Sequence, residues 1–382
     1  MKKKINSDFI IVGSGLYGCV LAERISNVLK KNVIIVEKRE HIGGNCYSEF
    51  DKETNVEYGK YGPHIFHTNL VKVWNYLNNF TKFNNYKHRC LSLYKNKMYS
   101  MPINLDTINH FFEKNFNPSK AEKFLAQQTK KYINKNPMNF EEKALSQVGK
   151  DLYEAFFKNY TTKQWGTIPK NLPHSIFNRL PLRFNYDQNY FKSSLYEGIP
   201  LDGYTNLFYN LIDNKKVKLL LNYDFELDDM TTAKKLTIYT GPLDKLFKNK
   251  FGKLQWRSLN FKKEIHNIKD YQGTSVVNYP ELKHKFTRIY EPKHIHIERN
   301  NFSKNKTLII KEYPTIDDDR PYYPINNTEN RNIHRRYKEL LKKNKSTNII
   351  IGGRLADYAY YDMDMTVSAA LVKFDEIKKN YT

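Results

Sequence analysis

The sequence predicts an α/β protein in which a Rossmann-type dinucleotide-binding domain is assembled from separate stretches of the chain. The first observation is a glycine-rich strand–helix–strand unit at residues 9–48. The second is a return to apolar strand, glycine turn and helix at residues 348–377, which would complete the same domain. The third is that the intervening chain divides into a helical and a β-rich stretch. We therefore expect an inserted helical domain and an antiparallel β-sheet domain.

The N-terminal unit begins with a short apolar run, residues 9–12, whose β-branched side chains suit a buried parallel strand. Gly13, Gly15 and Gly18 follow in G-x-G-x-x-G spacing, and apolar residues at helical intervals predict a helix over 16–30. Gly13 would allow a tight turn, Gly15 would let a pyrophosphate approach the backbone, and Gly18 would let the helix lie close to the strand. The N–H groups at the start of the helix would face the phosphates.

A second buried strand at residues 33–36 ends on Glu37. This residue stands about 20 residues beyond the glycine loop, where a carboxylate can accept a hydrogen bond from a ribose hydroxyl. The alternative, a glycine-rich turn in an unrelated α/β domain, does not explain Glu37. The complete unit therefore predicts a bound dinucleotide.

A second glycine loop indicates which dinucleotide is bound. Arg39 and the segment His-Ile-Gly-Gly-Asn at 41–45 extend the unit beyond its acidic residue. An extra Gly-Gly pair at this place resembles the FAD-binding oxidoreductase and amine oxidase class, whereas NAD-only domains do not usually have it. FAD is therefore favoured over NAD, and an ordinary Gly-Gly turn is the alternative.

The composition fits a folded protein of two or three domains, with 382 residues of which 40% are hydrophobic. The net charge of +23 could attract nucleic acid, a membrane surface or an anionic small substrate, but we favour a solvated basic surface. We find no nucleic-acid-binding module and no apolar run long enough to span a membrane. Cys19, Cys46 and Cys90 show neither metal nor disulfide spacing. A soluble cytoplasmic protein is therefore expected.

Two histidines, His64 and His67, lie on or next to a glycine- and proline-containing loop at residues 56–68. Their spacing could suggest metal ligands, but no nearby cysteine or acidic residue completes a set. We predict no metal site and prefer roles for these histidines in packing or flavin contact.

The middle of the chain is mainly helical over residues 69–165, interrupted by an expected strand pair at 86–101 with Lys95 and Asn96 at its turn. A β-rich pattern extends from 258 to 323 and includes the alternating segment Lys-His-Ile-His-Ile-Glu at 293–298. The predicted boundaries are 1–80 plus 201–247 plus 335–382 for the Rossmann-like FAD-binding domain, 81–175 for the mainly helical substrate domain, and 176–200 plus 248–334 for the antiparallel sheet domain.

A series of motifs runs from Gly13 to Asp364. They are GSGLYG, HIGGN, YGPHIFHT, PINL, LYEAFFKNYTTKQWG, RLPLRFNYDQNYF, YTGPLD, RSL, YQG, VVNY, TRIYE, KEY, PYYPI and GRLADYAYYDMD. Together they resemble the bacterial UDP-galactopyranose mutase family of flavoenzymes, in the family's order and over nearly the whole chain. The set is far more specific than any one motif.

The resemblance implies an isomerase that interconverts the pyranose and furanose forms of a sugar linked to UDP, for cell-surface polysaccharide synthesis. It implies that FAD is active when reduced, with NAD(P)H as the reductant, although the overall reaction has no net redox change. N5 of the reduced flavin would attack the anomeric carbon as UDP leaves. A homodimer with a nucleotide-sugar substrate is also implied.

The resemblance also implies roles for individual residues. Arg179 and Arg288 would bind the diphosphate as charge develops on the leaving UDP, and His64 would also be catalytic. Arg179 lies in a proline-bounded segment, 169–183, which resembles the family's mobile lid. The residues that match substrate contacts are Phe156, Tyr160 and Trp165 at uridine, Tyr190, Tyr323 and Tyr360 at the diphosphate, Asn278 near the flavin and sugar, Glu312 as an acidic residue of the active site, and Thr161. The residues that match cofactor contacts are Gly13, Ser14, Gly15, Tyr17, Gly18, Glu37, Lys38, Arg39, Gly44, Asn45, Arg257, Arg354, Asp362 and Met363.

Some positions depart from the family pattern. Gly59 and Lys60 stand where many members carry His and an apolar residue, His88 stands where Asn is expected, and Thr315 and Ala359 stand where Arg is usual. Because these positions are expected around the sugar, we hypothesise that the sugar is not plain galactose. The alternatives are UDP-GalNAc or a dTDP- or UDP-linked 6-deoxy sugar.

Two other functions compete with the mutase. The cofactor fold alone would also suit an FAD amine oxidase or dehydrogenase, which has no need of the uridine and diphosphate residues. A basic RNA- or membrane-binding protein would be colourless, and its binding would weaken steeply with salt. Without the resemblance, aromatic residues spaced as Phe156 and Tyr160 are more often core residues than ligand contacts.

Overall fold

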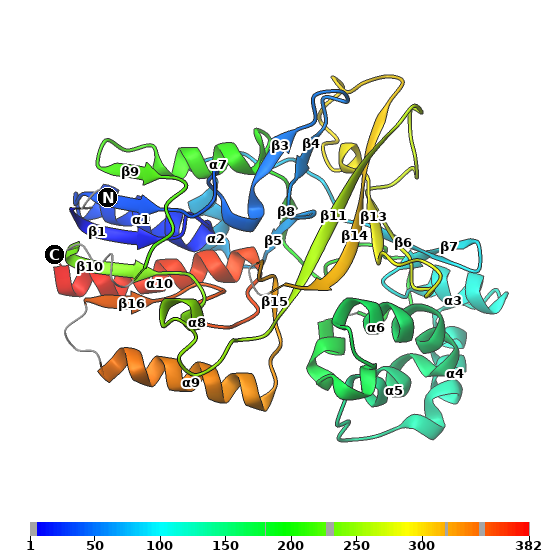
Figure 1. The fold of residues 1–382 in the computed structure, drawn as a ribbon. Coiled ribbons are helices and arrows are strands. Elements are labelled where there is room, and N and C mark those ends of the chain that lie inside the picture. The colour runs from blue at the N-terminus through cyan, green and yellow to red at the C-terminus, as the bar shows by residue number, and fades with distance from the viewer. Residues whose placement is uncertain (1–5, 180, 227–232, 318–319, 344–347, 382) are drawn as a thin grey trace.

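The computed structural model describes residues 6–179, 181–226, 233–317, 320–343 and 348–381, with only the backbone described for Asn178 and Arg179. Figure 1 shows a parallel sheet with helices on both faces, a long twisted sheet beside it, and a lobe of helices that hangs next to the far end of the long sheet. This arrangement agrees with the three kinds of unit expected from the sequence. The domain boundaries themselves stay a prediction, apart from the two corrections below.

The parallel sheet is the Rossmann-like part, and all four strand pairs in it are parallel. Its strands in spatial order are β16 (Ile349–Ile351), β10 (Ala233–Tyr239), β1 (Ser7–Val12), β2 (Val33–Val36) and β9 (Val217–Leu220). The apolar runs predicted at 9–12 and 33–36 are β1 and β2, and Phe9, Ile11 and Ile35 are completely buried. The sheet therefore brings together the N-terminal, middle and C-terminal stretches, as predicted.

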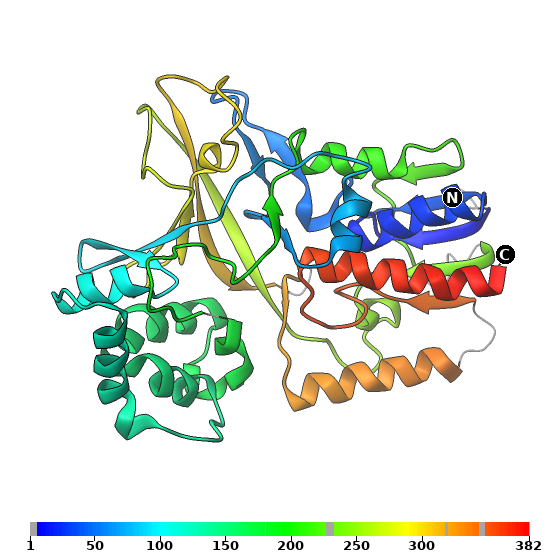
Figure 2. The ribbon, with the colours of Figure 1, turned by 180° about the vertical axis from the view of Figure 1, so that it is seen from behind.

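Helices cover both faces of this sheet. On one face α1 (Leu16–Val28) lies against α10 (Met363–Tyr381) and α7 (Gly203–Ile212). Figure 2, from behind, shows α10 lying along this face. On the other face α8 (Leu243–Leu246) and α9 (Thr328–Lys343) meet where the rings of Phe247 and Tyr337 stack. The predicted domain boundary between 334 and 335 falls inside α9, so α9 belongs with the parallel sheet and that boundary is wrong.

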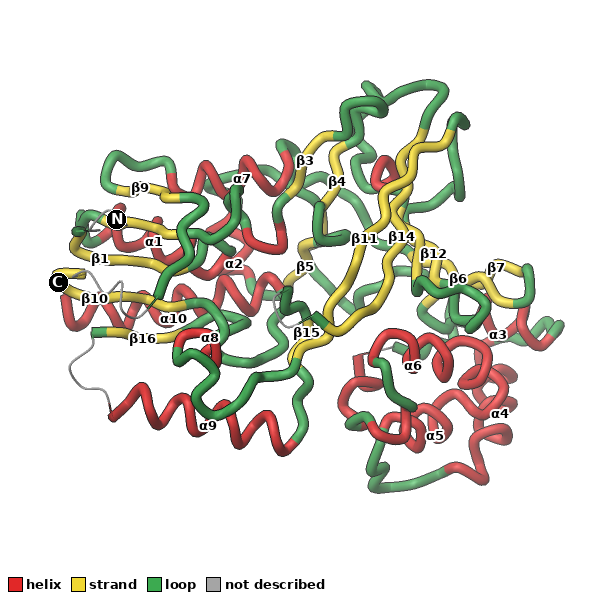
Figure 3. The backbone as a smooth tube through the Cα atoms, viewed as in Figure 1, coloured by secondary structure: helices red, strands yellow, loops and turns green. Residues whose placement is uncertain are grey.

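The second sheet has seven strands and is antiparallel except for the pair β12–β6. In spatial order its strands are β15 (Tyr323–Pro324), β11 (Trp256–His266), β14 (Thr307–Ile316), β13 (Arg288–Tyr290), β12 (Val276–Asn278), β6 (Cys90–Tyr94) and β7 (Lys97–Met101). The long strands β11 and β14 run diagonally beside each other in Figure 3. On its other side β14 pairs with β13, and the register of that pair places Arg288 on β13 opposite Glu312 on β14.

The strand pair expected at 86–101 is the hairpin β6–β7, and Lys95 and Asn96 both take the positive φ that a tight turn requires. However, β6 pairs with β12 of the seven-stranded sheet. The prediction that placed this hairpin inside the helical domain 81–175 is therefore wrong. A further correction, to the secondary structure, concerns residues 293–298, which were expected to form a strand. Residues Pro292–His294 form a 3-10 turn instead, because a proline at its first position fixes φ and has no N–H for a ladder.

The helical lobe consists of α3 (Leu105–Phe112), α4 (Pro118–Thr129), α5 (Phe140–Leu152) and α6 (Asn159–Trp165). Asparagine side chains cap α3, α4 and α5, at Asn104, Asn117 and Asn139. A π-helical turn, Tyr153–Lys158, joins α5 to α6. Such turns insert one extra residue and often occur near functional sites, and this one leads directly into the segment expected to bind uridine.

Short elements complete the fold. They are α2 (Val71–Leu77), the strand pairs β3 (Ser48–Phe50) with β4 (Glu57–Gly59) and β5 (Phe66–Thr68) with β8 (Tyr196–Gly198), and the 3-10 turns Gly44–Cys46, Lys130–Tyr132, Pro169–Asn171 and His174–Arg179. Among the helices that the structure describes, none has the length and apolar character needed to cross a bilayer.

Candidate functional site

A cavity of about 800 Å³ lies between the carboxyl ends of the parallel strands and the seven-stranded sheet. One end is formed by the glycine loop after β1, the residues after β2 and the segment after β10. The other end includes Arg288 and Tyr323 from the seven-stranded sheet. Ligands of open parallel sheets bind outside the carboxyl ends of the strands, so this cavity is the candidate site.

The glycine loop has the geometry that its sequence predicts. Gly13 has a φ of +106°, and a Cβ there would meet the Thr240 hydroxyl at 2.2 Å. A Cβ on Gly18 would lie 2.1 Å from the carbonyl oxygen of Gly13, so the helix could not approach the loop this closely with any larger residue. A Cβ on Gly15 would have nothing within 4 Å, so the backbone there is open to a ligand.

Glu37 braces this loop. Its Oε2 accepts hydrogen bonds from the Ser14 N–H and the Ser14 hydroxyl, both at 2.9 Å, and its Oε1 accepts from the Arg39 N–H at 3.0 Å. Glu37 is buried and also lines the cavity. The carboxylate thus ties the end of β2 to the phosphate-binding loop. Its contact with a ribose hydroxyl stays a prediction.

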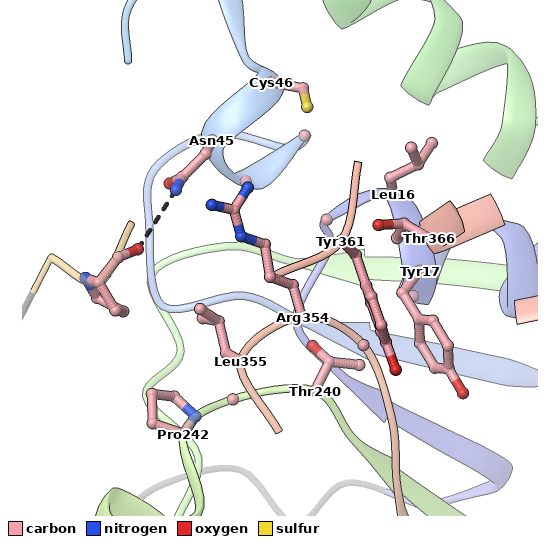
Figure 4. A pocket seen from close by; sticks show the side chains of 18 of the residues that line it. Leu16, Tyr17, Asn45, Cys46, Thr240, Pro242, Arg354, Leu355, Tyr361 and Thr366 are labelled. Carbon is pink, nitrogen blue, oxygen red and sulfur yellow. Dashed lines mark hydrogen bonds between the residues drawn. The ribbon is translucent and has the colours of Figure 1, made fainter. Parts of the chain in front are cut away.

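Two arginines that line the cavity have buried N–H groups without a hydrogen-bond partner among the described residues. These are Nη1 of Arg39 and Nε of Arg354. Arg39 otherwise donates to Asn45 and lies over the Tyr61 ring, and Arg354 Nη2 donates to the Tyr322 carbonyl oxygen at 2.5 Å. Figure 4 shows Arg354 extending toward Asn45 and Cys46. Buried cationic donors without partners suit an anionic ligand such as a dinucleotide diphosphate.

At the other end of the cavity, Arg288 is paired with Glu312. Arg288 Nε donates to Glu312 Oε2 at 2.9 Å, and the second carboxylate oxygen has no hydrogen-bond partner among the described residues. Burial alone would lower the pKa of Arg288, but the carboxylate of Glu312 holds that pKa well above its usual value. Arg288 therefore carries a permanent positive charge, and a buried carboxylate fixes the orientation of its guanidinium group.

Aromatic rings connect this end to the helical lobe. Tyr323 and Tyr360 stack with their centroids 5.7 Å apart, and the Arg354 guanidinium lies 5.3 and 4.8 Å from the two ring centroids. Trp165, the last residue of α6, lies 6.4 Å from Tyr323, centroid to centroid. The helical lobe thus reaches the rim of the cavity through the end of α6.

Most of the residues expected at the site are brought together. Those that line the cavity are Gly13, Gly15, Tyr17, Gly18, Glu37, Lys38, Arg39, Gly44, Asn45, His64, Tyr190, Arg288, Tyr323, Arg354, Tyr360, Asp362 and Met363. Ser14 and Glu312 contact lining residues, and Asn278 pairs with Arg288 across β12 and β13. The side chain of Arg179, at the end of a 3-10 turn, lies outside the described residues.

Other expected residues lie elsewhere. Phe156 is buried among Tyr94, Tyr99 and Phe111, with ring centroids 5.2–5.7 Å away, and does not line the cavity. Tyr160, Thr161 and Trp165 also lie outside the lining set. Arg257, which was expected near the cofactor, is also outside the lining set, although it pairs across strands with Tyr323. It is buried and donates to the carbonyl oxygens of Gln164 at 3.0 Å and Lys163 at 3.3 Å, at the end of α6.

Several further lining residues were not among the candidate site residues named from the sequence, although His67 was given a role in packing or flavin contact. They are His67, His88, Phe191, Tyr223, Asp224, Phe225, Glu226, Tyr239, Thr240, Tyr361 and Thr366. His67 stacks on Phe191 with centroids 3.7 Å apart, and His88 lies 5.0 Å from the Tyr190 ring. Five of them, His67, Phe191, Tyr239, Thr240 and Tyr361, stand in the motifs that carry the resemblance, and His88 was flagged as a departure. The other five belong to no short motif.

His64 is held as a neutral ring. Its Nδ1 lies 2.9 Å from the carbonyl oxygen of Gly62, so Nδ1 carries the proton and Nε2 is left as an acceptor. Burial, followed by the charges of Arg354 and Arg288, lowers its pKa to about 4. At neutral pH His64 is therefore unprotonated at Nε2, which can accept a hydrogen bond.

Outside the cavity, Asp270, Glu291 and His294 form a compact acidic group. Lys293 Nζ lies 3.3 Å from Asp270 and 3.2 Å from Glu291. The lysine already supplies the positive charge that this group needs, so we assign it no metal.

His88 should make folding sensitive to acid. It is buried, and burial followed by the charges of Arg288 and His67 lowers its pKa to about 3. The ordinary pKa of about 6.5 applies in the unfolded chain. Because the folded pKa is depressed, the stabilisation is complete above pH 6.5 and is lost as the pH falls toward 3, by up to about 1.4 kcal/mol per pH unit.

We therefore expect His88→Asn to reduce the loss of thermal stability between pH 6.5 and pH 4.5. The comparison is between unfolding curves of the variant and the wild type across this range. His110→Asn, at an exposed position on α3, is the matched control and should leave the acid dependence as it is. An unchanged pH dependence in His88→Asn would contradict the neutral buried state of His88.

Comparisons with known proteins agree with this geometry. A family model described as UDP-galactopyranose mutase matches residues 155–360, and one described as NAD(P)-binding Rossmann-like domain matches residues 11–80. The chain is 39% identical over 376 residues to a probable UDP-galactopyranose mutase of Klebsiella pneumoniae, covering 97% of this chain and 94% of the relative. It is 38% identical over 370 residues to a dTDP-fucopyranose mutase of Escherichia coli, covering 95% and 96%.

Solved structures show the same fold. A crystal structure of reduced UDP-galactopyranose mutase aligns with a TM-score of 0.77 at 13% identity, covering 98% of this chain and 96% of that one. A putrescine oxidase variant aligns with a TM-score of 0.58 at 9% identity, covering 98% and 99%. At these identities the structural likeness supports the architecture alone.

Proposed function

The chain belongs to the UDP-galactopyranose mutase family of isomerases, and from this premise we propose that it converts nucleotide-linked galactopyranose to the furanose form with FAD bound in the large cavity. The observation that carries the proposal is that one cavity holds an open glycine loop at one end and the Arg288–Glu312 pair at the other. A dinucleotide and a nucleotide sugar would therefore meet inside it.

The cofactor end fits FAD. The backbone at Gly15 is open, and Arg39 and Arg354 supply buried donors without partners for a diphosphate. Gly13, Gly18, Gly44, Asn45, Asp362 and Met363 complete the expected cradle. When bound and reduced, with NAD(P)H as the proposed reductant, FAD would supply the nucleophile for the anomeric carbon.

The end of the cavity that includes Arg288 would bind the nucleotide diphosphate, which is the leaving group of the reaction. Arg288, aimed by Glu312, would hold the diphosphate and stabilise the negative charge that develops as UDP departs. We assign a parallel role to Arg179 and hydrogen bonds from Tyr190, Tyr323 and Tyr360 to the same phosphates. Asn278, beside Arg288, would contact the sugar.

The uridine would lie at the end of α6. Support comes from Trp165, which reaches Tyr323 at the rim of the cavity and lies beyond Tyr160 and Thr161 on the same helix. Phe156 contributes differently from the expected base contact, because its ring lies in the aromatic core of the lobe. It would support the π-helical turn that aims α6.

His64 would handle a proton. Its Nδ1 is fixed by the Gly62 carbonyl oxygen, so Nε2 is the atom that can accept a proton from a sugar hydroxyl. The depressed pKa keeps the ring neutral at neutral pH and makes Nε2 a weak base, so any proton that it takes up is held only briefly.

A second candidate is the same reaction on a modified sugar, such as dTDP-fucose, another 6-deoxy sugar or UDP-GalNAc. The five departing positions, Gly59, Lys60, His88, Thr315 and Ala359, all lie within the described residues, and His88 alone among them lines the large cavity. The similarity to a dTDP-fucopyranose mutase also favours this candidate. His88 is therefore the position to test first for sugar choice.

The test uses dithionite-reduced protein incubated separately with UDP-galactopyranose, UDP-GalNAc and dTDP-fucopyranose. We expect a new furanose peak on anion-exchange chromatography with at least one donor, and none without reduction. A peak only from dTDP-fucopyranose would assign the second candidate. A yellow protein that yields no furanose from any donor but oxidises an amine would contradict the proposal.

We also propose that the protein acts as a homodimer in the cytoplasm and supplies furanose donors for cell-surface polysaccharide. The support for this part is the family alone. Light scattering of the purified protein should give twice the chain mass of 45.5 kDa. A mass of a single chain would contradict the dimer.

A further inference from the structure

The ammonium group of Lys163 lies inside a ring of backbone carbonyl groups. Lys163 is on α6, and its Nζ donates to the carbonyl oxygens of Tyr279 at 2.5 Å, Glu281 at 3.1 Å, His284 at 2.9 Å and Phe286 at 2.9 Å. All four acceptors belong to residues 279–287, the connection between β12 and β13. This connection is wrapped around the end of one side chain from another part of the fold.

Four carbonyl dipoles that converge on one point repel one another unless a cation lies between them. An ammonium group has three N–H donors in tetrahedral arrangement, and here it shares them among four oxygens. The charged group next to it is Glu281 of the same connection, whose carboxylate also pairs with Lys283 at 3.1 Å. The positive charge of Lys163 is therefore what holds the connection in its curled form.

The two sides joined by this contact carry different parts of the site. Tyr160 and Trp165 flank Lys163 on the helical side, and Asn278 and Arg288 stand at the two ends of the carbonyl-bearing connection. Arg257 of β11 reinforces the junction, since it donates to the main-chain carbonyl oxygens of Lys163 and Gln164. Two cations thus anchor the end of α6 to the seven-stranded sheet.

We propose that Lys163 is a positioning residue that fixes the uridine-binding end of α6 relative to Arg288, so that one nucleotide can contact both. This inference rests on the proposed function. The lysine touches neither the cavity nor the reacting atoms in this assignment. It acts through the carbonyl-bearing connection, whose displacement would separate the base-binding and diphosphate-binding groups.

The central test compares Lys163→Met with wild type and with Lys158→Met. Methionine keeps an unbranched stem without the charge, and Lys158 is an exposed lysine in the π-helical turn before α6. We expect Lys163→Met to raise the UDP dissociation constant and the KM by roughly 10- to 100-fold, with a smaller change in kcat. Flavin content should stay at the wild-type level, because the glycine loop is far along the cavity. Lys158→Met should match the wild type in the UDP dissociation constant, KM, kcat and flavin content.

A rescue experiment separates positioning from loss of side-chain packing. Lys163→Ala leaves a channel that propylammonium can fill, with its nitrogen among the carbonyls, whereas propan-1-ol has the same length without the charge. We expect propylammonium, and not propanol, to restore UDP binding measured by calorimetry. Tight UDP binding by Lys163→Met, or no recovery with propylammonium, would overturn the inference. Wild-type protein that fails to bind UDP would instead contradict the proposed function on which the inference rests.

Discussion

Replacing Arg288 with alanine is expected to lower turnover by roughly 100- to 1,000-fold, because the variant loses a fixed cation at the place where charge develops on the leaving UDP. The structure gives two reasons to single out this residue. Arg288 lines the cavity, and its guanidinium is aimed by a single hydrogen bond to a buried carboxylate, Glu312. The measurement is steady-state turnover of reduced enzyme with whichever donor yields furanose in the chromatographic test proposed above.

Stability must be separated from catalysis in this experiment. Removing Arg288 leaves Glu312 buried without its partner, which costs about 3–5 kcal/mol in comparable sites. The double variant Arg288→Gln/Glu312→Gln removes both charges and should regain stability without regaining turnover. Arg299→Ala is the matched control, since Arg299 also pairs with a buried carboxylate, Glu57 at 2.8 Å, but lies outside the cavity. It should lose stability and keep turnover per folded molecule. Full turnover by the double variant would refute the assigned role of Arg288.

Replacing Gly15 with valine is expected to yield a folded protein without flavin. A Cβ at Gly15 would meet no protein atom within 4 Å, so the fold should tolerate the side chain. The same space is where we place the cofactor diphosphate. We expect flavin content, from the absorbance of the purified protein, to fall from near one per chain to below about one tenth. Circular dichroism should remain that of the wild type.

Gly18→Val, unlike Gly15→Val, is expected to disturb the fold itself. A Cβ there would lie 2.1 Å from the Gly13 carbonyl oxygen and 3.1 Å from the Ile11 side chain, so the strand and helix must separate. Overpacking of this kind costs roughly 1–3 kcal/mol or more, and the variant should be unstable as well as colourless. Equal flavin content in Gly15→Val and wild type would show that the cofactor does not approach the loop at this residue.

The Rossmann-like part could be predicted because its signals are local. The strand–glycine–helix order around Gly13, Gly15 and Gly18 follows from steric limits that act within a few residues. The hairpin turn at Lys95 and Asn96 was predicted on similar local grounds. The sheet to which this hairpin belongs could not be predicted, because β6 pairs with β12, which lies far along the chain. The alternating pattern at 293–298 was misleading because Pro292 starts a 3-10 turn just before it.

For the site, too, local motifs were informative and contacts between distant parts of the chain could not be predicted. The family motifs found most lining residues, but they did not show how those residues are held. The opposition of Arg288 and Glu312 depends on the register of β13 with β14, and the anchoring of α6 by Lys163 and Arg257 depends on contacts across the fold. The spacing of Phe156 and Tyr160 could not show that Phe156 lies in a π-helical turn with its ring packed in the core of the lobe.

The central claim is that this protein breaks and re-forms the bond between the anomeric carbon and the diphosphate oxygen of a nucleotide sugar. The most direct test is positional isotope exchange, with ¹⁸O placed in the bridging anomeric oxygen of the donor that is turned over. We predict that the reduced protein moves the label into the non-bridging β-phosphate oxygens, as seen by ³¹P NMR, and that the oxidised protein does not. Furanose formation with the label still wholly in the bridge would contradict the account.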